Sequence, residues 1–328
     1  MANDSMPADT SEPPRGRYRI AFVVTAMLAL AVVVTLPFSI ASVVNDVLGP
    51  ATGKVFPLMT DRRTSVDQLD MSRLHLAVVA LDEIQLVTTL RVSGHHTCSS
   101  DCRWKDRLLI VSVGPDDAAA EGMPPTVSFV LPAATAAVSQ TILLPVTGFP
   151  IHYPFDRYHL TLAVALQRDY PDGRVETMAP DQAPRHLSLS IQELLPNQIM
   201  SAPVPVDPKS IRAPGDPVEY AAAYSVSFER PRYLRVLAVL LVLLIAAAAA
   251  YSVFLRPLTD LVVNSGALVL GIWGIRAIIT PGNLYYLTSI DLALSTVILF
   301  LLGGLTVKAV LLAHDRGGLQ ILRRPPRS

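Results

Sequence analysis

The sequence carries little charge for its length. Only 16% of its 328 residues are Asp, Glu, Lys or Arg, whereas 51% are hydrophobic. Average globular domains carry about a quarter charged residues. The apolar excess lies at the two ends of the chain, so composition predicts that both ends are buried in a membrane. The formal net charge is zero, which gives no support to nucleic-acid binding.

Lysine is scarce among the basic residues. Of the 27 basic residues, only four are lysine: Lys54, Lys105, Lys209 and Lys308. Together with the many alanines, this arginine bias is typical of a high-GC bacterial genome. It reflects codon usage and indicates no mechanism.

Cysteine is also scarce, and the two cysteines present lie close together. Cys98 and Cys102 occur in the segment His-His-Thr-Cys-Ser-Ser-Asp-Cys. In an exported domain they are expected to form a disulfide that closes a very small loop and stabilises it only locally. The neighbouring His95 and His96 leave a metal site open as an alternative, which is disfavoured because four-ligand sites usually space their ligand pairs more widely. Reduction would abolish the disulfide, and chelation would abolish a metal site.

Motifs of the common catalytic classes are missing. The sequence contains no Gly-x-Ser-x-Gly, no His-Glu-x-x-His and no glycine-rich phosphate loop. His152 and His159 flank Asp156, but two histidines in a turn are usually surface residues. The sequence therefore predicts a protein that is not an enzyme and uses no cofactor or metal.

One turn organises the middle of the chain. Residues 148–159 read Gly-Phe-Pro-Ile-His-Tyr-Pro-Phe-Asp-Arg-Tyr-His, and two prolines with a glycine favour an ordered, non-repeating turn. Asp156 is expected to accept backbone N–H bonds within this turn. The turn motif consists of Tyr153, Pro154, Phe155, Asp156 and Tyr158.

A strand follows the turn directly. Small or polar residues occupy every second position from 157 to 165. The residues between and after them form one apolar face: Tyr158, Leu160, Leu162, Val164 and Leu166. This period of two is typical of a strand with one buried face.

Further strand patterns extend over the region from 73 to 230, which we predict to be an exported antiparallel β-sandwich domain. Two proline-containing loops interrupt it, at 168–185 and 196–217. The second holds six prolines, so it cannot be a central strand and is expected to run over the surface. The strands are expected at 74–81, 84–92, 108–113, 126–131, 138–144, 157–166, 186–191 and 222–229.

The N-terminal region contains the first long apolar run. Residues 1–17 are polar and proline-containing, which predicts a disordered cytoplasmic tail. Residues 18–44 follow as a transmembrane anchor, and the arginines before the run place the N-terminus in the cytoplasm. A cleaved signal peptide, with Ser39-Ile40-Ala41 as its cleavage site, is the alternative. Residues 45–72 are a polar connector.

The C-terminal region is predicted to form a three-helix transmembrane domain over residues 231–312. Its helices are expected at 233–255, 261–279 and 287–312, each long enough to cross a hydrocarbon core of about 30 Å. The arginine-rich tail, 313–328, then lies in the cytoplasm. Arg230, Arg232 and Arg235 depart from the charge rule because they lie at the outer entry of the first of these helices.

Two charged residues inside these helices are expected to meet. Arg276 and Asp291 are equally distant from the middle of the loop that joins the last two helices, so an antiparallel hairpin places them opposite each other. An unpaired charge at that depth is costly, so we predict a structural ion pair and prefer it to an ion pathway. Ala267 and Gly271 predict tight helix packing, and Asn264 an interhelical hydrogen bond.

The turn motif and the helix segment Leu-Gly-Ile-Trp-Gly-Ile-Arg ending at Arg276 resemble a large uncharacterised family of bacterial membrane proteins. The resemblance implies a β-rich domain followed by membrane spans, and it implies no activity. A fainter similarity is to pentameric ligand-gated channels, which have a Pro-Phe-Asp turn in an extracellular sandwich and an arginine at the junction with the first helix, as at Arg230. Three spans instead of four after the sandwich, an added N-terminal span and differently placed cysteines depart from that pattern.

These patterns predict an integral membrane protein of the bacterial envelope that presents a β-sandwich for binding or scaffolding. Its expected partners are membrane lipids, an unknown envelope protein or ligand, and further copies of itself. A ligand-gated-channel-like oligomer and an enzyme of an unrecognised type are the alternatives. We also expect turn 148–158 to pack on loop 280–286 at the membrane surface, with Asp156 paired to Arg230 or Arg232. The alternative is that Phe155 fills the sandwich core and the turn lies at the distal end of the sandwich.

Overall fold

The computed structural model describes residues 53–60, 71–97, 104–112, 126–132, 135–196, 198–208, 211, 218–279 and 287–322, together with scattered positions from 23 to 44. The chain forms two compact units. The strand unit comprises Asp46–Arg232 and Asn283–Tyr286, and the helical unit comprises Met1–Asn45, Tyr233–Gly282 and Leu287–Ser328.

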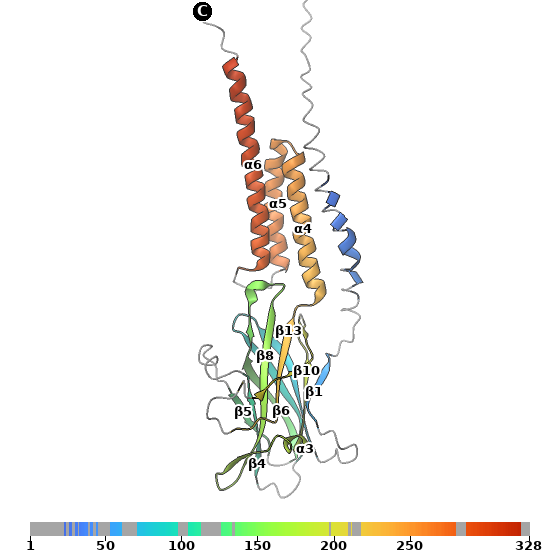
Figure 1. Cartoon of the computed structure of the whole chain (residues 1–328), viewed down its shortest axis with the longest axis vertical. Helices are drawn as coiled ribbons and strands as arrows, with labels where there is room; N and C mark the ends of the chain where they lie inside the picture. Colours follow the sequence, from blue (N-terminus) through green and yellow to red (C-terminus); the bar gives the residue numbers. More distant parts are fainter. Residues whose placement is uncertain are drawn as a thin grey trace, which may run out of the picture. The chain divides into compact units, whose positions relative to one another are not determined.

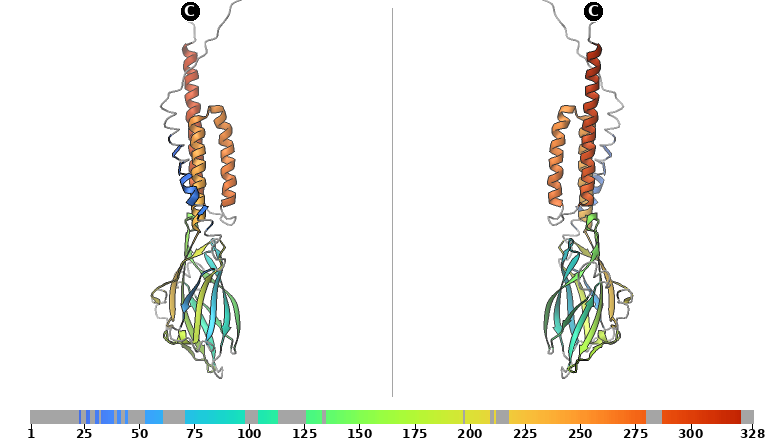
Figure 2. Two further views of the ribbon diagram at one scale, coloured as in Figure 1. Left: turned by 90° about the vertical axis from the view of Figure 1, so that its right-hand side faces the viewer. Right: turned by 90° about the vertical axis from the view of Figure 1, so that its left-hand side faces the viewer.

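The strand unit consists of two sheets in a sandwich-like arrangement (Figures 1 and 2). The first sheet has the order β1 (Val55–Met59), β10 (Leu187–Glu193), β2 (Ser72–Asp82), β3 (Val87–His96) and β6 (Ala136–Pro145). The second has the order β11 (Ile199–Met200), β13 (Ala222–Glu229), β8 (Arg157–Asp169), β4 (Lys105–Val111) and β5 (Thr126–Val130). Three short strands extend the second sheet, with β12 (Val204–Pro205) on β13 and with β7 (Thr147–Gly148) and β9 (Val175–Thr177) on β8. Each of the eight expected strands has a counterpart, so the β-sandwich prediction is confirmed.

The prediction that all strands are antiparallel is wrong for one pair. β10 pairs with β2 in parallel, from Leu187 opposite Ser72 to Glu193 opposite Val78. Parallel neighbours need a long crossover connection, and more than a hundred positions of sequence separate these two strands. The period-2 pattern marks a strand's buried face but carries no information on the direction of its neighbour.

The connector and the first loop contain structure that the sequence patterns did not reveal. β1 lies within the predicted connector 45–72 and pairs antiparallel with β10 at the edge of the first sheet. It is five residues long and includes Pro57, and prolines in sheets are largely confined to edge strands. Within 168–185, β8 continues to Asp169, β9 pairs back on it, and α3 (Ala183–His186) follows.

The sandwich core forms from alternating residues of both sheets. The face of β8 that begins with Tyr158 is buried through Leu166, as the alternation predicts. The opposite face is also covered, because Ala163 and Ala165 pack with Ile211 of the proline-rich segment 196–217 and with Tyr220, which lies between this segment and β13. Ile211 therefore lies on the outer face of the second sheet, and the strands in the described part of the segment are the two-residue strands β11 and β12.

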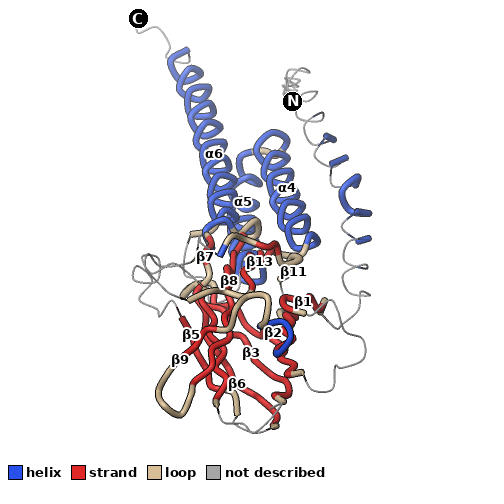
Figure 3. Tube along the Cα trace, turned by 60° about the horizontal axis from the view of Figure 1, so that its bottom comes forward, coloured by secondary structure: helices blue, strands red, loops and turns tan. Residues whose placement is uncertain are grey.

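The helical unit contains α4 (Arg232–Leu255), α5 (Leu258–Ile279) and α6 (Ser289–Leu322), drawn in blue in Figure 3. α4 and the stretch Ser289–His314 of α6 are long and apolar enough to cross a membrane, whereas the apolar stretch of α5, Leu258–Gly274, is shorter. The described positions from Val23 to Val44 are helical. α6 continues past residue 312, where the tail was expected, since no proline occurs before Pro325.

The helices do not pack where the small residues of α5 predicted. A Cβ atom added at Gly271 would meet nothing within 4 Å, whereas one added at Gly304 of α6 would lie 2.6 Å from Val253 Cγ1 of α4. α4 and α6 therefore approach each other closely at Gly304. The prediction that Ala267 and Gly271 form a tight contact surface is wrong for the described part of the chain.

Candidate functional site

The β7–β8 turn is a compact structure built by its prolines and glycine. After β7, Pro150 begins the short 3₁₀ helix η2 (Pro150–His152), and a cis peptide joins Tyr153 to Pro154. Gly148 lies directly against the ring of Tyr158, because a Cβ at this position would be 2.3 Å from Tyr158 Cδ1. Tyr153 and Tyr158 are buried, so the turn closes one end of the core.

Asp156 pairs with Arg230, the residue that follows β13. Arg230 Nε and Nη2 each donate to Asp156 Oδ2 at 3.1 Å, and the two side chains are 0% and 4% exposed for Asp156 and Arg230. The suggested pairing of Asp156 with Arg230 is thus confirmed. The prediction that Asp156 accepts backbone N–H bonds of its own turn is wrong among the described residues, because the guanidinium occupies its carboxylate instead.

A second carboxylate, which the sequence patterns did not reveal, completes the cluster. Arg230 Nη2 also donates to Glu83 Oε1, and Gln198 Nε2 donates to the same oxygen at 2.9 Å. Glu83 lies between β2 and β3, next to Asp82, which accepts the backbone N–H groups of Ile84 and Gln85. Adjacent acidic residues between two strands usually indicate a solvated turn, so no sequence signal distinguished Glu83. We call Glu83, Asp156 and Arg230 the ion cluster.

The ion cluster holds two carboxylates for one guanidinium. Burial raises the pKa of Glu83 despite the attraction of Arg230. Burial opposes the charge on Arg230, but attraction by Glu83 and Asp156 outweighs this and raises its pKa. Burial, with the nearby Glu83 and Asp156, also raises the pKa of Tyr158. The cluster is therefore anionic only while Glu83 is ionised.

This arrangement predicts a pH dependence of stability that depends on Glu83. Because the pKa of Glu83 is raised on folding, its protonated form stabilises the fold below about pH 4.5, and this contribution is lost as pH rises through the folded-state pKa. Glu83→Gln keeps a neutral side chain at all pH values. We expect the stability difference between the wild type and Glu83→Gln to shift against the wild type as pH rises from 4 to 7, measured by thermal unfolding. A pH-independent difference would contradict the raised pKa.

The outer side of the turn carries exposed apolar residues. Phe149, Ile151 and Phe155 are 68%, 50% and 51% exposed. Phe149 and Phe155 border a groove of about 480 Å³, whose lining also includes Leu86, Thr147, Gly148, His152, Arg157 and His159. Exposed apolar patches rimmed by polar groups often mark interaction surfaces. Loop 280–286, the expected partner of this turn, lies outside the described residues, so that contact stays a prediction.

The helical unit contains the predicted pair of Arg276 and Asp291. Arg276 Nε contacts Asp291 Oδ1, and Nη2 lies 3.4 Å from Oδ2. Asp291 also accepts from Thr288 N at 2.9 Å and from Thr288 Oγ1 at 3.0 Å, so Thr288 and Asp291 form a capping box at the start of α6. The Thr-x-x-Asp spacing of Thr288 and Asp291 is a sequence signal for this capping role of Asp291.

The remaining site predictions concern the cysteines and metals. Cys98 and Cys102 lie outside the described residues, so the disulfide stays a prediction. In the part of the chain that the structure describes, no group of three or more His, Cys, Asp or Glu side chains is arranged to hold a metal ion.

Comparison with known proteins finds a match between part of the sequence and one family. Residues 123–191 match a family described as a domain of unknown function, DUF4436. The matched segment covers β5 to β10 and therefore includes the β7–β8 turn and Asp156. No curated protein matches the sequence.

Proposed function

We propose that this chain is an integral membrane protein of the bacterial envelope that presents its β-sandwich on the outer side for non-catalytic binding or scaffolding. α4 and α6 would cross the membrane, and α5 and residues 18–44 would supply two further spans. Four spans return both termini to the cytoplasm, in agreement with the arginines near each end. The expected partners are lipids and an envelope protein or ligand.

One observation supports this proposal most directly. The ion cluster links the β2–β3 turn and the β7–β8 turn to Arg230, which lies two residues before the start of α4. A buried charge network at the junction between a sandwich and a candidate membrane helix fixes the two turns to that junction. The network therefore fixes, within the strand unit, the segment from which the chain continues into α4.

Reporter fusions test the proposed topology. Fusions of a reporter active only in the cytoplasm, placed after Arg256 and after Ser328, should be active. Fusions placed in loops between residues 75 and 225 should be active only with a reporter of the exported side. A C-terminus on the exported side would show that α5 does not cross the membrane. A soluble, cytoplasmic sandwich would overturn the proposal.

A channel-like oligomer is the second candidate. It is favoured by the contact between Asp156 and Arg230, because these residues carry the similarity to pentameric ligand-gated channels. A channel of that kind requires a ring of subunits around a pore. The mass of the purified, detergent-solubilised protein would distinguish a ring from a monomer.

A further inference from the structure

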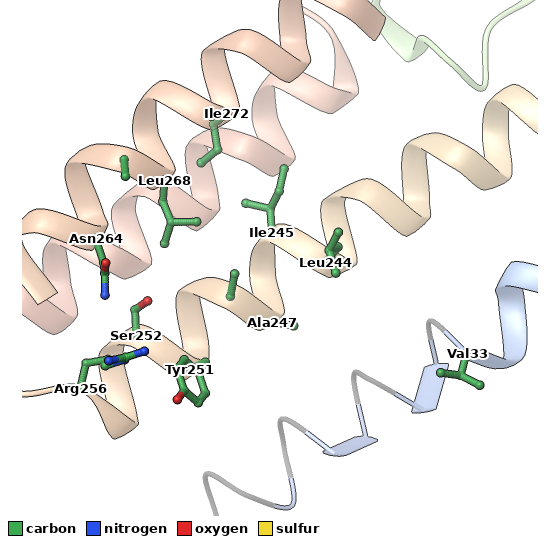
Figure 4. Close-up of a pocket in the computed structure, with 13 residues that line it drawn as sticks. Val33, Leu244, Ile245, Ala247, Tyr251, Ser252, Arg256, Asn264, Leu268 and Ile272 are labelled. Carbon is green, nitrogen blue, oxygen red and sulfur yellow. The ribbon is translucent and has the colours of Figure 1, made fainter. Parts of the chain in front are cut away.

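A cavity of about 700 Å³ lies within the helical unit, between α4 and α5 (Figure 4). Most of its lining is apolar and comes from three segments of the chain: Val33, Leu244, Ile245, Ala247, Ala248, Ala267, Leu268, Gly271 and Ile272. The volume lies within the range of about 300–1,000 Å³ that is usual for small-molecule sites. An apolar cavity of this size can bind a hydrocarbon chain.

Polar side chains gather at one end of the cavity. Figure 4 shows Tyr251, Ser252, Arg256 and Asn264 together at this end, with Ile272 and Leu244 farther along. Ser252, which is only 5% exposed, and the half-buried Asn264 both line this end. Buried polar groups are normally hydrogen-bonded. The polar end therefore offers hydrogen-bonding groups to a ligand.

This end of the cavity is also cationic. Arg256 lines it, and its nearest described acidic partner, Asp260, lies 3.9 Å away, beyond hydrogen-bond distance. Lys308 Nζ donates to the carbonyl oxygen of Arg256 at 2.6 Å, which adds a second positive charge. Guanidinium groups bind phosphate through two parallel hydrogen bonds. The positive charge at this end of an apolar cavity therefore favours binding of an anionic amphiphile.

We infer that this cavity binds an anionic phospholipid, with one acyl chain between α4 and α5 and the phosphate at Arg256. The inference rests on the proposed membrane insertion of the helical unit. Ser252 and Asn264 donate to the ester or phosphate oxygens of the lipid. The bound chain fills the space beside Ala267 and Gly271, which explains why a Cβ added at Gly271 meets no described atom within 4 Å.

The matched pair Gly271→Leu and Gly274→Leu tests the site. A Cβ at either glycine meets nothing within 4 Å, but only Gly271 lines the cavity. The full-length protein, purified in detergent, is titrated with phosphatidylglycerol and with phosphatidylcholine of the same acyl chains, and bound lipid is counted by native mass spectrometry. Gly271→Leu should weaken phosphatidylglycerol binding about tenfold, the loss expected when roughly two methylene groups are no longer buried. Gly274→Leu should bind like the wild type.

A second pair of variants tests the headgroup contact. Arg256→Gln should weaken phosphatidylglycerol binding about fivefold, the usual contribution of one basic residue at an anionic surface. It should weaken phosphatidylcholine binding less, because the choline cation of that lipid already offsets the charge of its phosphate. Arg232→Gln, at the opposite end of α4, should change neither.

Several results would overturn the inference. Equal binding by Gly271→Leu and Gly274→Leu would exclude the cavity as the lipid site. Equal affinity of the wild type for the two lipids would exclude a preference for anionic lipid, and unchanged phosphatidylglycerol binding by Arg256→Gln would exclude the role of Arg256. A change in subunit number in Gly271→Leu would assign the cavity to a second copy of the chain. If the thiol of a Val33→Cys variant resisted labelling in the lipid-free protein, the cavity would be assigned to the N-terminal segment. Recovery of the wild type without detergent, in the soluble fraction, would instead refute the proposed membrane insertion.

Discussion

Replacing Arg230 with methionine should destabilise the strand unit by about 3–5 kcal/mol, the usual effect of removing one partner from a buried ion pair. Arg230 is the only described cation that contacts Asp156 and Glu83. Its loss leaves two carboxylates that are 0% and 12% exposed without a counter-charge. The apparent melting temperature of the purified full-length protein, followed through its β-sheet signal, measures this effect.

Two controls separate the buried cluster from ordinary surface charge. Arg157 pairs with Glu229 at 3.0 Å, but the two side chains are 62% and 33% exposed. Arg157→Met should therefore cost less than about 1 kcal/mol. Adding Asp156→Asn and Glu83→Gln to Arg230→Met should restore much of the lost stability, because no buried charge then remains. Equal losses for Arg157→Met and Arg230→Met would show that the cluster is not buried in solution.

The effect of Arg230→Met should also depend on pH. Since burial already raises the pKa of Glu83, loss of the guanidinium removes the main attraction that favours its ionised form. Protonation of the carboxyl groups at low pH then relieves the uncompensated charge, so the penalty should be smaller near pH 4 than at pH 7. A penalty that is the same at both pH values would indicate a loss of packing rather than of charge pairing.

Replacing Arg276 with methionine should be the most harmful single change in the helical unit. Asp291 is 7% exposed at its side chain and would lose its only described cationic partner. An uncompensated carboxylate at the centre of a membrane helix costs about 2.5–3.5 kcal/mol. Asp291 lies in the first turn of α6, so its loss of Arg276 should cost less than this. The expected result is a lower yield of folded protein in detergent and a lower melting temperature of the helices, measured by circular dichroism.

Because Asp291 also caps α6, the choice of its replacement matters in a double variant with Arg276→Met. Asp291→Ala removes both the ion pair and the bonds from Thr288, whereas Asp291→Asn keeps an oxygen that can accept from Thr288 N. Arg276→Met with Asp291→Asn should therefore recover more stability than Arg276→Met with Asp291→Ala. Asp260→Asn, in the exposed pair with Arg256, is the matched control and should have little effect. Single variants that match the wild type, with no coupling in the double variant, would show that the pair does not form.

The sequence alone determined the features that follow from local periodicity and chain symmetry. Alternation placed Tyr158 and Leu160 in the sandwich core, since a strand has a fixed period of two. The equal distances of Arg276 and Asp291 from their loop placed the two residues opposite each other, since an antiparallel hairpin allows no other register. The arginine at the end of β13 and the aspartate of the turn already suggested a pair.

Only the tertiary structure decided which distant elements meet. The parallel pairing of β10 with β2 and the edge position of β1 depend on strand order, which side-chain periodicity does not encode. Glu83 joins Arg230 across 147 positions of sequence, because folding brings the β2–β3 turn to the end of β13. The cavity beside Gly271 likewise depends on α4 packing against α6 at Gly304 instead of against α5. Small residues permit close helix contact, but which helices come into contact depends on the packing of the whole helical unit.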